Sequence, residues 1–332
     1  MRKHFSLSLY LSSALVATLI GGCASVDTHL PSPGTAQMTQ ETRTQEQEAF
    51  KRFRTMLTRL DNIGAQIKRS NAPLCEKTAY DLGVMTHRKK SYPKALREAA
   101  ARFMDAGDEP KVLLVRENSV AARAGVKIGD VFLDDKGKVG SDHRKDPVRV
   151  GDVLHVRRDG KALDLVVDQA APEICDYDIN LNFSTAINAF ANGRSITVTA
   201  AMMDFAIKDE ELALVLGHEL AHNTMHHVRK AVVNTILSGF ATRYTRPFEA
   251  EADYVGLYYT TRAGYDIDGV EEFWRRLGVQ SPKTVVRAKS HPSTPARLLS
   301  IRLTAEEIAD KKSKNEPLVP NFKPGKEPQK KS

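Results

Sequence analysis

The sequence predicts an α+β fold in which a small β-rich module precedes a mainly helical domain. The 332 residues exceed the length of one small domain and suit two. Residues 108–171 contain short apolar runs between turn signals, a pattern typical of strands, whereas residues 209–263 contain start and stop signals typical of helices. With 41% hydrophobic residues the chain can bury a core, which excludes wholesale disorder.

The charge balance and cysteine count exclude several other classes of protein. Lys and Arg number 49 against 41 Asp and Glu, a net charge of +8 that is spread along the chain. Nucleic-acid binding usually needs a dense basic stripe, so we expect no nucleic-acid partner. Three cysteines are too few for a disulfide-dense scaffold or a Cys-rich zinc ribbon.

The first 22 residues are predicted to be an export signal. Arg2 and Lys3 precede the mostly apolar stretch Phe5–Ile20, which at roughly 16 residues is short for a membrane span of about 20. Small residues then precede Cys23, as in the lipobox of bacterial lipoproteins, and we predict lipidation of Cys23. The alternative is an ordinary cleaved signal with an incidental cysteine.

The residues after Cys23 refine the expected location. Ala24 replaces the Asp that commonly retains bacterial lipoproteins at the inner membrane, so we expect an outer-membrane lipid anchor with the chain facing the periplasm. Residues 23–44, rich in Ser, Thr, Pro and Gln, are predicted to be a flexible tether. Residues 309–332 are Lys-rich and predicted to be a disordered tail, with a membrane-surface role for its lysines as the alternative.

Residues 45–107 are predicted to be a helical region that packs on the domain following it. Over residues 45–69, apolar side chains recur at steps of three and four with charges between them, which indicates an amphipathic helix. We favour a helix packed on the core over a coiled coil. The apolar positions are Phe50, Phe53, Leu57, Leu60 and Ile67.

Residues 108–171 resemble the bacterial PDZ pattern of strand, short helix of small residues, Gly-Asp turn and further strands. Such modules bind peptides by adding a strand to a sheet edge. A Gly-rich carboxylate-binding loop is not recognisable before Val112, so a spacer or shield over another site remains an equal alternative. The expected strands are Val112–Val115, Val131–Leu133, Val153–Val156 and Leu163–Val167.

Cys75 and Cys175 flank this module. A compact inserted module brings its two ends together, so we predict a disulfide that clamps its base in an oxidising compartment. On a chain-entropy estimate such a bridge stabilises the fold by about 4–5 kcal/mol. The alternative is two free buried thiols.

The strongest chemical signal is His218-Glu219-Leu220-Ala221-His222. Histidines four residues apart lie on one face of a helix and can hold one metal ion together. Glu219 can lie beside that ion and act on its water. Asp209 is expected to cap this helix at its positive end. The alternative is a histidine-bearing helix that matches the motif by accident.

A catalytic zinc site usually has three protein ligands and an open fourth position, so a third ligand should follow. Residues 247–263 are predicted to form a second helix, on which Glu249 and Asp253 lie one turn apart. Glu249 can reach the metal, and Asp253 can accept a hydrogen bond from a ligand histidine. Glu251 lies away from that face and is the weaker candidate. Taken alone, the segment also fits a solvated acidic helix start.

The pattern His218-Glu219-x-x-His222 followed by Glu249-x-x-x-Asp253 resembles metallopeptidase family 48, the gluzincin family that includes HtpX and the CAAX prenyl proteases. This resemblance implies a helical zinc-metallopeptidase fold. It also implies that His218, His222 and Glu249 bind one zinc ion per chain. Glu219 is implied to be the general base and later the proton donor.

A second element extends the resemblance over about residues 175–300. His291-Pro-x-x-x-x-Arg297 matches the element that follows the second helix in soluble and periplasmic family members. The resemblance implies that Asp253 and Arg297 support the ligands from outside. It implies that His291 stabilises the oxyanion or occupies the open metal position at rest. We place the metallopeptidase domain at residues 172–308.

The resemblance also suggests where a substrate lies. A hairpin precedes the metal helix in the family, and Ile196, Thr197, Val198 and Thr199 match its strand. We expect this strand to be the sheet edge on which substrate backbone is added. His227 falls where family members often carry a histidine, but no ligand role is assigned to it, and His226 is expected at the surface.

These expectations combine into a secreted, lipid-anchored zinc endopeptidase that hydrolyses peptide bonds in cell-envelope protein quality control. Its expected partners are unfolded or misassembled envelope proteins as substrates, and the membrane through the N-terminal lipid. One alternative is a gated or weakly active assembly or chaperone factor that keeps the peptidase fold. The other is a peptide-binding lipoprotein that acts through residues 108–171.

Overall fold

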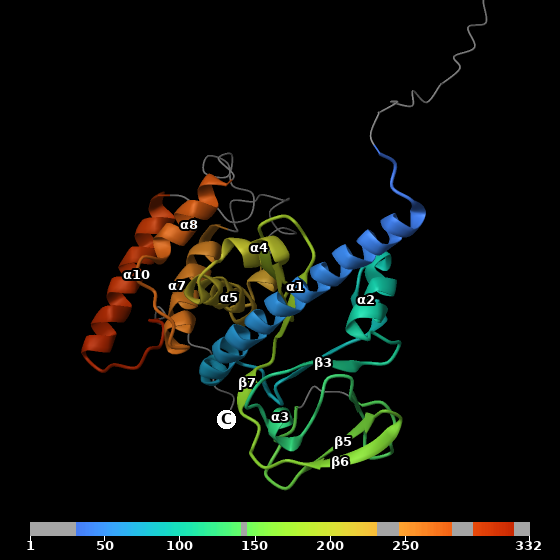
Figure 1. The fold of residues 1–332 in the computed structure, drawn as a ribbon. Coiled ribbons are helices and arrows are strands. Elements are labelled where there is room, and N and C mark those ends of the chain that lie inside the picture. The colour runs from blue at the N-terminus through green and yellow to red at the C-terminus, as the bar shows by residue number, and fades with distance from the viewer. Residues whose placement is uncertain (1–30, 141–144, 231–245, 281–294, 322–332) are drawn as a thin grey trace, which may run out of the picture. The chain divides into compact units, whose positions relative to one another are not determined.

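The computed structural model describes residues 31–140, 145–230, 246–280 and 295–321 (Figure 1). The predicted export signal, Cys23 and His291 lie outside these residues. The chain divides into two units, Met1–Arg43 and Thr44–Ser332, and the architecture below is that of the second unit. Helices and sheets are mixed, which confirms the α+β class.

Helix α1 (Thr35–Ser70) contains the predicted helix of residues 45–69 but begins earlier than expected. The tether predicted for residues 23–44 is therefore wrong from Thr35 onward. Residues 35–44 contain no Gly or Pro, and Gln, Glu, Met and Arg favour helices, whereas Pro33 and Gly34 lie just before the helix start. Its buried positions follow a helical repeat: Phe50, Phe53, Leu57, Leu60, Ile63 and Ile67.

The region expected to be helical up to residue 107 contains two short strands. Strand β1 (Thr78–Tyr80) pairs antiparallel with β7 (Glu173–Cys175), and β2 (Val84–His87) pairs antiparallel with β3 (Lys111–Val115). Strands of three and four residues show too little alternation to be recognised in sequence. Helix α2 (Arg97–Met104) follows, and single 3-10 turns lie at Ala72–Leu74, Lys89–Ser91 and Lys94–Leu96.

Residues 108–171, here called the β module, contain β3, the short helix α3 (Val120–Ala124) and an antiparallel sheet of order β4-β5-β6. The three strands are β4 (Val131–Phe132), β5 (Val153–Arg158) and β6 (Lys161–Val166). The hairpin turn at Asp159-Gly160, between β5 and β6, has both φ angles positive, 49° and 77°. The apolar core of the β module includes Val112, Val120, Phe132, Leu154, Val156 and Val167.

A disulfide joins Cys75 to Cys175, with the two Cα atoms 5.6 Å apart. Cys175 belongs to β7 and faces Thr78 of β1, so the bridge lies beside that strand pair. The two segments that lead into and out of the β module are therefore joined covalently at its base.

A second three-stranded sheet has the order β8-β10-β9, from strands β8 (Asp178–Asn182), β9 (Ala189–Ala191) and β10 (Ser195–Thr199). Strand β10 is parallel to β8 and antiparallel to β9. The prediction that Ile196–Thr199 is a sheet edge is therefore wrong, because this strand is paired on both sides. Ile196 and Val198 are buried, as suits a central strand, and β9 is an edge of this sheet among the described strands.

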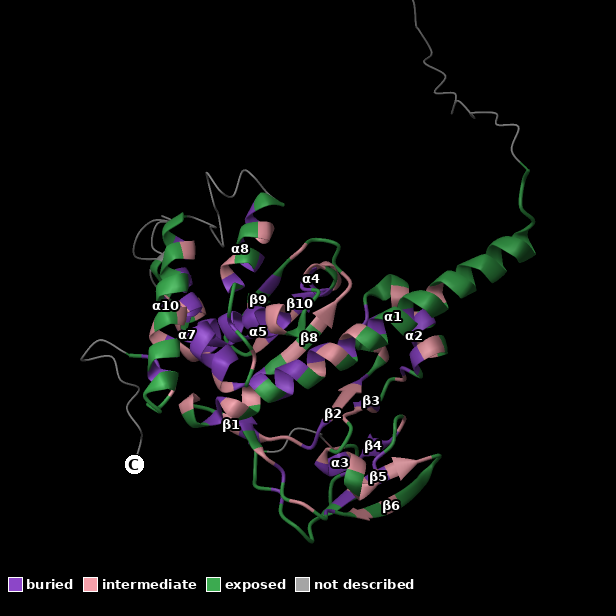
Figure 2. Ribbon diagram, turned by 60° about the vertical axis from the view of Figure 1, so that its left-hand side comes forward, coloured by how far each residue is buried: buried purple, intermediate pink, exposed green. Residues whose placement is uncertain are grey.

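The helical part contains α4 (Ala200–Phe205), α5 (Asp209–Thr224), α7 (Arg246–Arg262), α8 (Val270–Val279) and α10 (Pro295–Ser313). Helix α7 contacts α5 on one side and α10 on the other (Figure 1). The whole run Leu212–Asn223 of α5 is buried, so this helix forms the centre of the core (Figure 2).

Helices α5 and α7 meet at two glycines. A Cβ added to Gly256 would lie 2.8 Å from the backbone N and Cα of His218. A Cβ added to Gly217 would lie 2.7 Å from the carbonyl oxygen of Gly256. The two backbones therefore touch, and no side chain larger than hydrogen fits between them.

The tail predicted to be disordered from residue 309 is ordered as far as Asn321. Helix α10 continues to Ser313, and the buried Lys311 donates from Nζ to the carbonyl oxygen of Val319 at 2.6 Å and to Oδ1 of Asn321 at 2.7 Å. Its Nζ also lies 5.1 Å from the ring centroid of Tyr258. A lysine stem can cover apolar surface, so its charge did not reveal this contact. Within the described ranges, no helix has the length and apolar character needed to cross a bilayer.

Candidate metal centre

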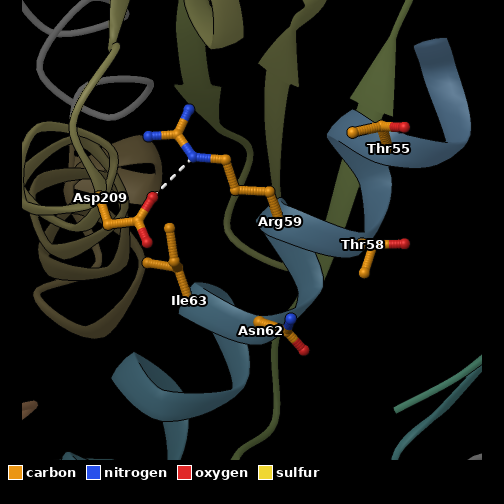
Figure 3. Close-up of a pocket in the computed structure, with 6 residues that line it drawn as sticks. All are labelled: Thr55, Thr58, Arg59, Asn62, Ile63 and Asp209. Atoms are coloured by element: carbon orange, nitrogen blue, oxygen red, sulfur yellow. Dashed lines mark hydrogen bonds and ion pairs between the residues drawn. The ribbon is translucent and has the colours of Figure 1, made fainter. Parts of the chain in front are cut away.

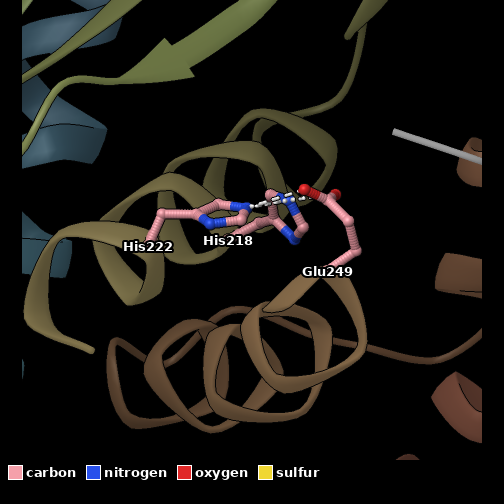
Figure 4. Close-up of side chains that lie close together, drawn as sticks. All are labelled: His218, His222 and Glu249. Atoms are coloured by element: carbon pink, nitrogen blue, oxygen red, sulfur yellow. Dashed lines mark hydrogen bonds and ion pairs between the residues drawn. The ribbon is translucent and has the colours of Figure 1, made fainter. Parts of the chain in front are cut away.

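Helices α5 and α7 bring His218, His222 and Glu249 together (Figure 4). The two histidines lie one turn apart on α5, and Glu249 lies in the first turn of α7. Their Nε2 atoms are 3.1 Å apart. The Glu249 carboxylate oxygens lie 3.6 Å from Nε2 of His218 and 3.5 Å from Nε2 of His222. All three residues are buried.

This arrangement fits a zinc ion. Zinc lies about 2.0–2.1 Å from a histidine nitrogen, so two such nitrogens on a tetrahedral ion lie about 3.3 Å apart. The observed spacing of 3.1 Å is close to this value. Two imidazole nitrogens and one carboxylate are also the donor types of catalytic zinc sites, which leave the fourth position open. The residues present therefore suit the metal that the sequence predicts.

The charges around the site favour a cation. Burial alone would lower the pKa of His218, but hydrogen bonds to Asp253 and Glu249 and the negative charges of Asp253 and Glu219 raise it to about 10. The same carboxylates would favour a metal ion in place of the proton.

Asp253 and Arg297 support His218 from outside the ligand set. Nδ1 of His218 lies 2.9 Å from Oδ1 of Asp253, and Nη2 of Arg297 donates to that same oxygen at 2.7 Å. Burial would raise the pKa of Asp253, but the charge of Arg297 and the hydrogen bond from His218 lower it, so this carboxylate stays ionised. The structure thus places both residues where the sequence analysis expected them.

Trp274 of α8 is part of this environment and was not predicted from sequence. Its ring lies 4.3 Å below the Arg297 guanidinium carbon and 5.3 Å from the His218 ring centroid. A cation above an aromatic face is attracted to it, and the large ring excludes water. A lone tryptophan more than fifty residues after the motif carries no local signal of this role.

Glu219 follows His218 on α5 and is 3% exposed. Its negative charge raises the pKa of His218 and also that of Arg297, so it acts on the interior of the site. Asp209, by contrast, is not the helix cap. The carboxylate of Glu211 accepts from the backbone N–H of Lys208 instead, in a capping box.

Asp209 pairs with Arg59 of α1 in a surface pocket at the start of α5 (Figure 3). Arg59 also donates to the carbonyl oxygens of Ala206 and Ile207 at 2.8 and 3.1 Å. These bonds fasten α1 to the turn before α5. The pocket therefore has a structural explanation separate from the metal centre.

Two more residues adjoin the site without having been assigned a role. His227 Nδ1 lies 3.0 Å from Nδ1 of His222, and its Nε2 lies 2.8 Å from Oε2 of Glu251. Glu251 thus contacts His227, and it is absent from the ligand group. His226 is exposed, as expected, and lies 3.0 Å from Glu76.

Asn223 fastens the β9–β10 hairpin to the metal helix. Its Oδ1 accepts from the backbone N–H of Gly193 at 2.7 Å, and its Nδ2 donates to the carbonyl oxygen of Ser195 at 3.2 Å. Asn223 directly follows the ligand His222. The turn between β9 and β10 and the first residue of β10 are therefore fastened to α5.

Comparison with known proteins places the resemblance on this part of the chain. Residues 161–241 and 231–305 match Peptidase family M48. The mitochondrial metalloendopeptidase OMA1 of Schizosaccharomyces pombe is 24% identical over 170 residues, which cover 41% of this chain and 50% of that protein. The beta-barrel assembly-enhancing protease of Yersinia pestis is 26% identical over 160 residues, covering 37% of this chain and 33% of that protein.

The matched region thus spans half or less of the length of these relatives. It includes the elements that carry His218, His222 and Glu249. The chain resembles the family in the part that carries the candidate metal ligands.

Proposed function

We propose that this chain, which resembles peptidase family M48 over residues 161–305, is a zinc metalloendopeptidase. The observation that carries the proposal is the buried convergence of His218, His222 and Glu249 within 3.1–3.6 Å, with Glu219 next in sequence to the first histidine. Two relatives named as a metalloendopeptidase and a protease support the same activity.

Each residue of the candidate site has a separate role in peptide-bond hydrolysis. Zinc held by the three ligands would lower the pKa of a water molecule and polarise the scissile carbonyl. The carboxylate of Glu219 accepts the proton of the attacking water and returns it to the leaving amine. Asp253, held ionised by Arg297, accepts the Nδ1 proton of His218 and so keeps the Nε2 lone pair of His218 directed into the site.

We propose that the backbone of the substrate pairs with β9, and not with β10. Among the described strands, β9 is an edge of its sheet, and backbone groups at a sheet edge can pair with an extended peptide. The tie through Asn223 holds this hairpin to the metal helix. Phe190, in the middle of β9, is 41% exposed and offers an apolar contact to a substrate side chain.

We further propose a role in protein quality control in a bacterial envelope, with unfolded or misassembled envelope proteins as substrates. The predicted signal and lipobox cysteine support a lipid-anchored, periplasm-facing location. The Cys75–Cys175 disulfide suits an oxidising compartment. The β module, with its PDZ-like order of elements, would bind peptide or shield the site.

The first experiment measures zinc content and cleavage of unfolded casein by the mature wild type and Glu219→Gln. We expect one zinc per chain in both and cleavage by the wild type only, since the substitution removes the proton acceptor and keeps the shape. Zinc in both without cleavage in either would support the gated alternative. A wild type that binds no zinc would refute the metallopeptidase.

A further inference from the structure

We propose that His227 and Glu251 are positioning residues that hold His222 as a metal ligand. The inference rests on the proposed zinc centre and goes beyond it, because neither residue is a ligand. His222 Nδ1, His227 Nδ1, His227 Nε2 and Glu251 Oε2 form a chain with spacings of 3.0 and 2.8 Å. The chain ends on the ring nitrogen of His222 that faces away from the metal centre.

The chemistry of the groups fixes the direction of both hydrogen bonds. A carboxylate only accepts, so Nε2–H of His227 donates to Glu251. When His227 carries a single proton, on Nε2, its Nδ1 has a lone pair and accepts from Nδ1–H of His222. This places the lone pair of His222 on Nε2, the atom that lies 3.1 Å from Nε2 of His218 and 3.5 Å from Glu249.

The surroundings of His227 hold its ring in the required plane. The side chain is 2% exposed, and the ring stacks on Phe248 with centroids 4.8 Å apart and planes 18° apart. Glu251 and Phe248 both belong to α7, as does the ligand Glu249. Helix α7 therefore supplies one metal ligand and also fixes the ring that orients another.

The two ligand histidines are oriented by different means. His218 is held directly by a carboxylate, Asp253, which Arg297 holds in turn. His222 is held by a second imidazole, with the carboxylate one step further away. Both arrangements fix a ligand tautomer, and partners of this kind typically contribute about 10–100-fold to metal affinity.

The test measures zinc affinity by chelator competition in His227→Phe, His227→Gln and wild type. Phe keeps the stacking on Phe248 but cannot accept from His222, so we expect zinc affinity to fall about 10–100-fold. Gln supplies a carbonyl oxygen as acceptor and should recover part of that loss. The matched control His226→Asn removes the neighbouring exposed imidazole and should bind zinc as the wild type does. Thermal unfolding of the metal-free proteins separates lost affinity from lost folding.

A double-mutant cycle tests whether Glu251 acts through His227. Glu251→Gln alone should weaken zinc binding by less than His227→Phe, because an amide oxygen still accepts. The double variant should bind no more weakly than His227→Phe alone. ¹⁵N-histidine NMR of the zinc-loaded wild type should show the Nδ1–H tautomer at His222.

The outcomes separate the two proposals. Wild type that binds zinc, with unchanged affinity in both His227 variants, would overturn the positioning role and leave the metallopeptidase intact. Additive losses from His227→Phe and Glu251→Gln would overturn the connected chain. A wild type without zinc affinity would overturn the metal centre and this inference with it.

Discussion

The α5–α7 pair and the β module differ in how deeply two of their ion pairs are buried. Between α5 and α7, charged and ionisable side chains are buried, and Arg297, Asp253 and His218 satisfy one another. In the β module, Arg123 and Asp168 pair at the surface, with side chains 50% and 47% exposed, although Arg158 also pairs there with the buried Asp130. The buried Arg297–Asp253 pair therefore depends on each partner, whereas the exposed Arg123–Asp168 pair tolerates the loss of a charge.

The largest expected effect comes from the covalent link at the base of the β module. Replacing Cys75 and Cys175 with Ser should lower the free energy of unfolding by about 4–5 kcal/mol, because the unfolded chain loses a closed loop of about 100 residues. Urea denaturation with and without a reductant measures this change in the free energy of unfolding. The reductant should shift the wild-type midpoint to that of the double variant; an unshifted wild type would contradict the prediction.

The buried and exposed arginines give the most direct comparison. Arg297→Met leaves the Asp253 carboxylate buried without its cation and should cost about 3–5 kcal/mol. Arg123→Met in the β module removes an exposed partner of Asp168 and should cost far less, because solvent screens this pair. Denaturation of the two metal-free variants side by side measures both. Equal costs would remove the distinction drawn between the regions.

Two glycine substitutions, one at the α5–α7 contact and one away from it, test that contact. Gly256→Ala puts a methyl group 2.8 Å from the backbone of His218, so we expect a loss of about 3 kcal/mol and weaker zinc binding. Gly107→Ala, beside the β module, meets only the flexible Lys111 side chain at 3.6 Å and should change stability by less than about 0.5 kcal/mol. Stable, zinc-binding Gly256→Ala would show that the helices can separate without cost.

The pH dependence of stability gives a further comparison, between two buried histidines. Burial lowers the pKa of His87 from 6.5 to about 4, the opposite direction to His218, which has carboxylates around it. As pH falls from about 6.5 toward 4, the unfolded chain takes up a proton that folded His87 refuses, so stability decreases. His87→Gln should flatten this part of the pH–stability curve, which urea denaturation at a series of pH values measures; an unchanged slope would contradict the prediction.

How far the sequence predicted the site depended on whether its residues lie on regular elements. Once each segment is a helix, spacing alone places His218 and His222 on one face of α5. In the same way it places Glu249 and Asp253 on one face of α7. The chain from His222 through His227 to Glu251 depends on how α7 packs on α5, which no local spacing reveals. The resemblance implied that β10 is an edge, and its parallel pairing with β8 could not be read from the sequence. The strands β1 and β2 were missed because they are only three and four residues long.

The contact between Gly217 and Gly256 has a consequence for how this protein can change. Because backbone meets backbone there, the separation of α5 and α7 is set by atoms common to every amino acid. Substitutions among the surrounding Leu, Val and Tyr side chains can alter the core without moving the histidines relative to Glu249. The distances between the histidines and Glu249 therefore do not change when core residues are substituted, as long as both glycines are kept.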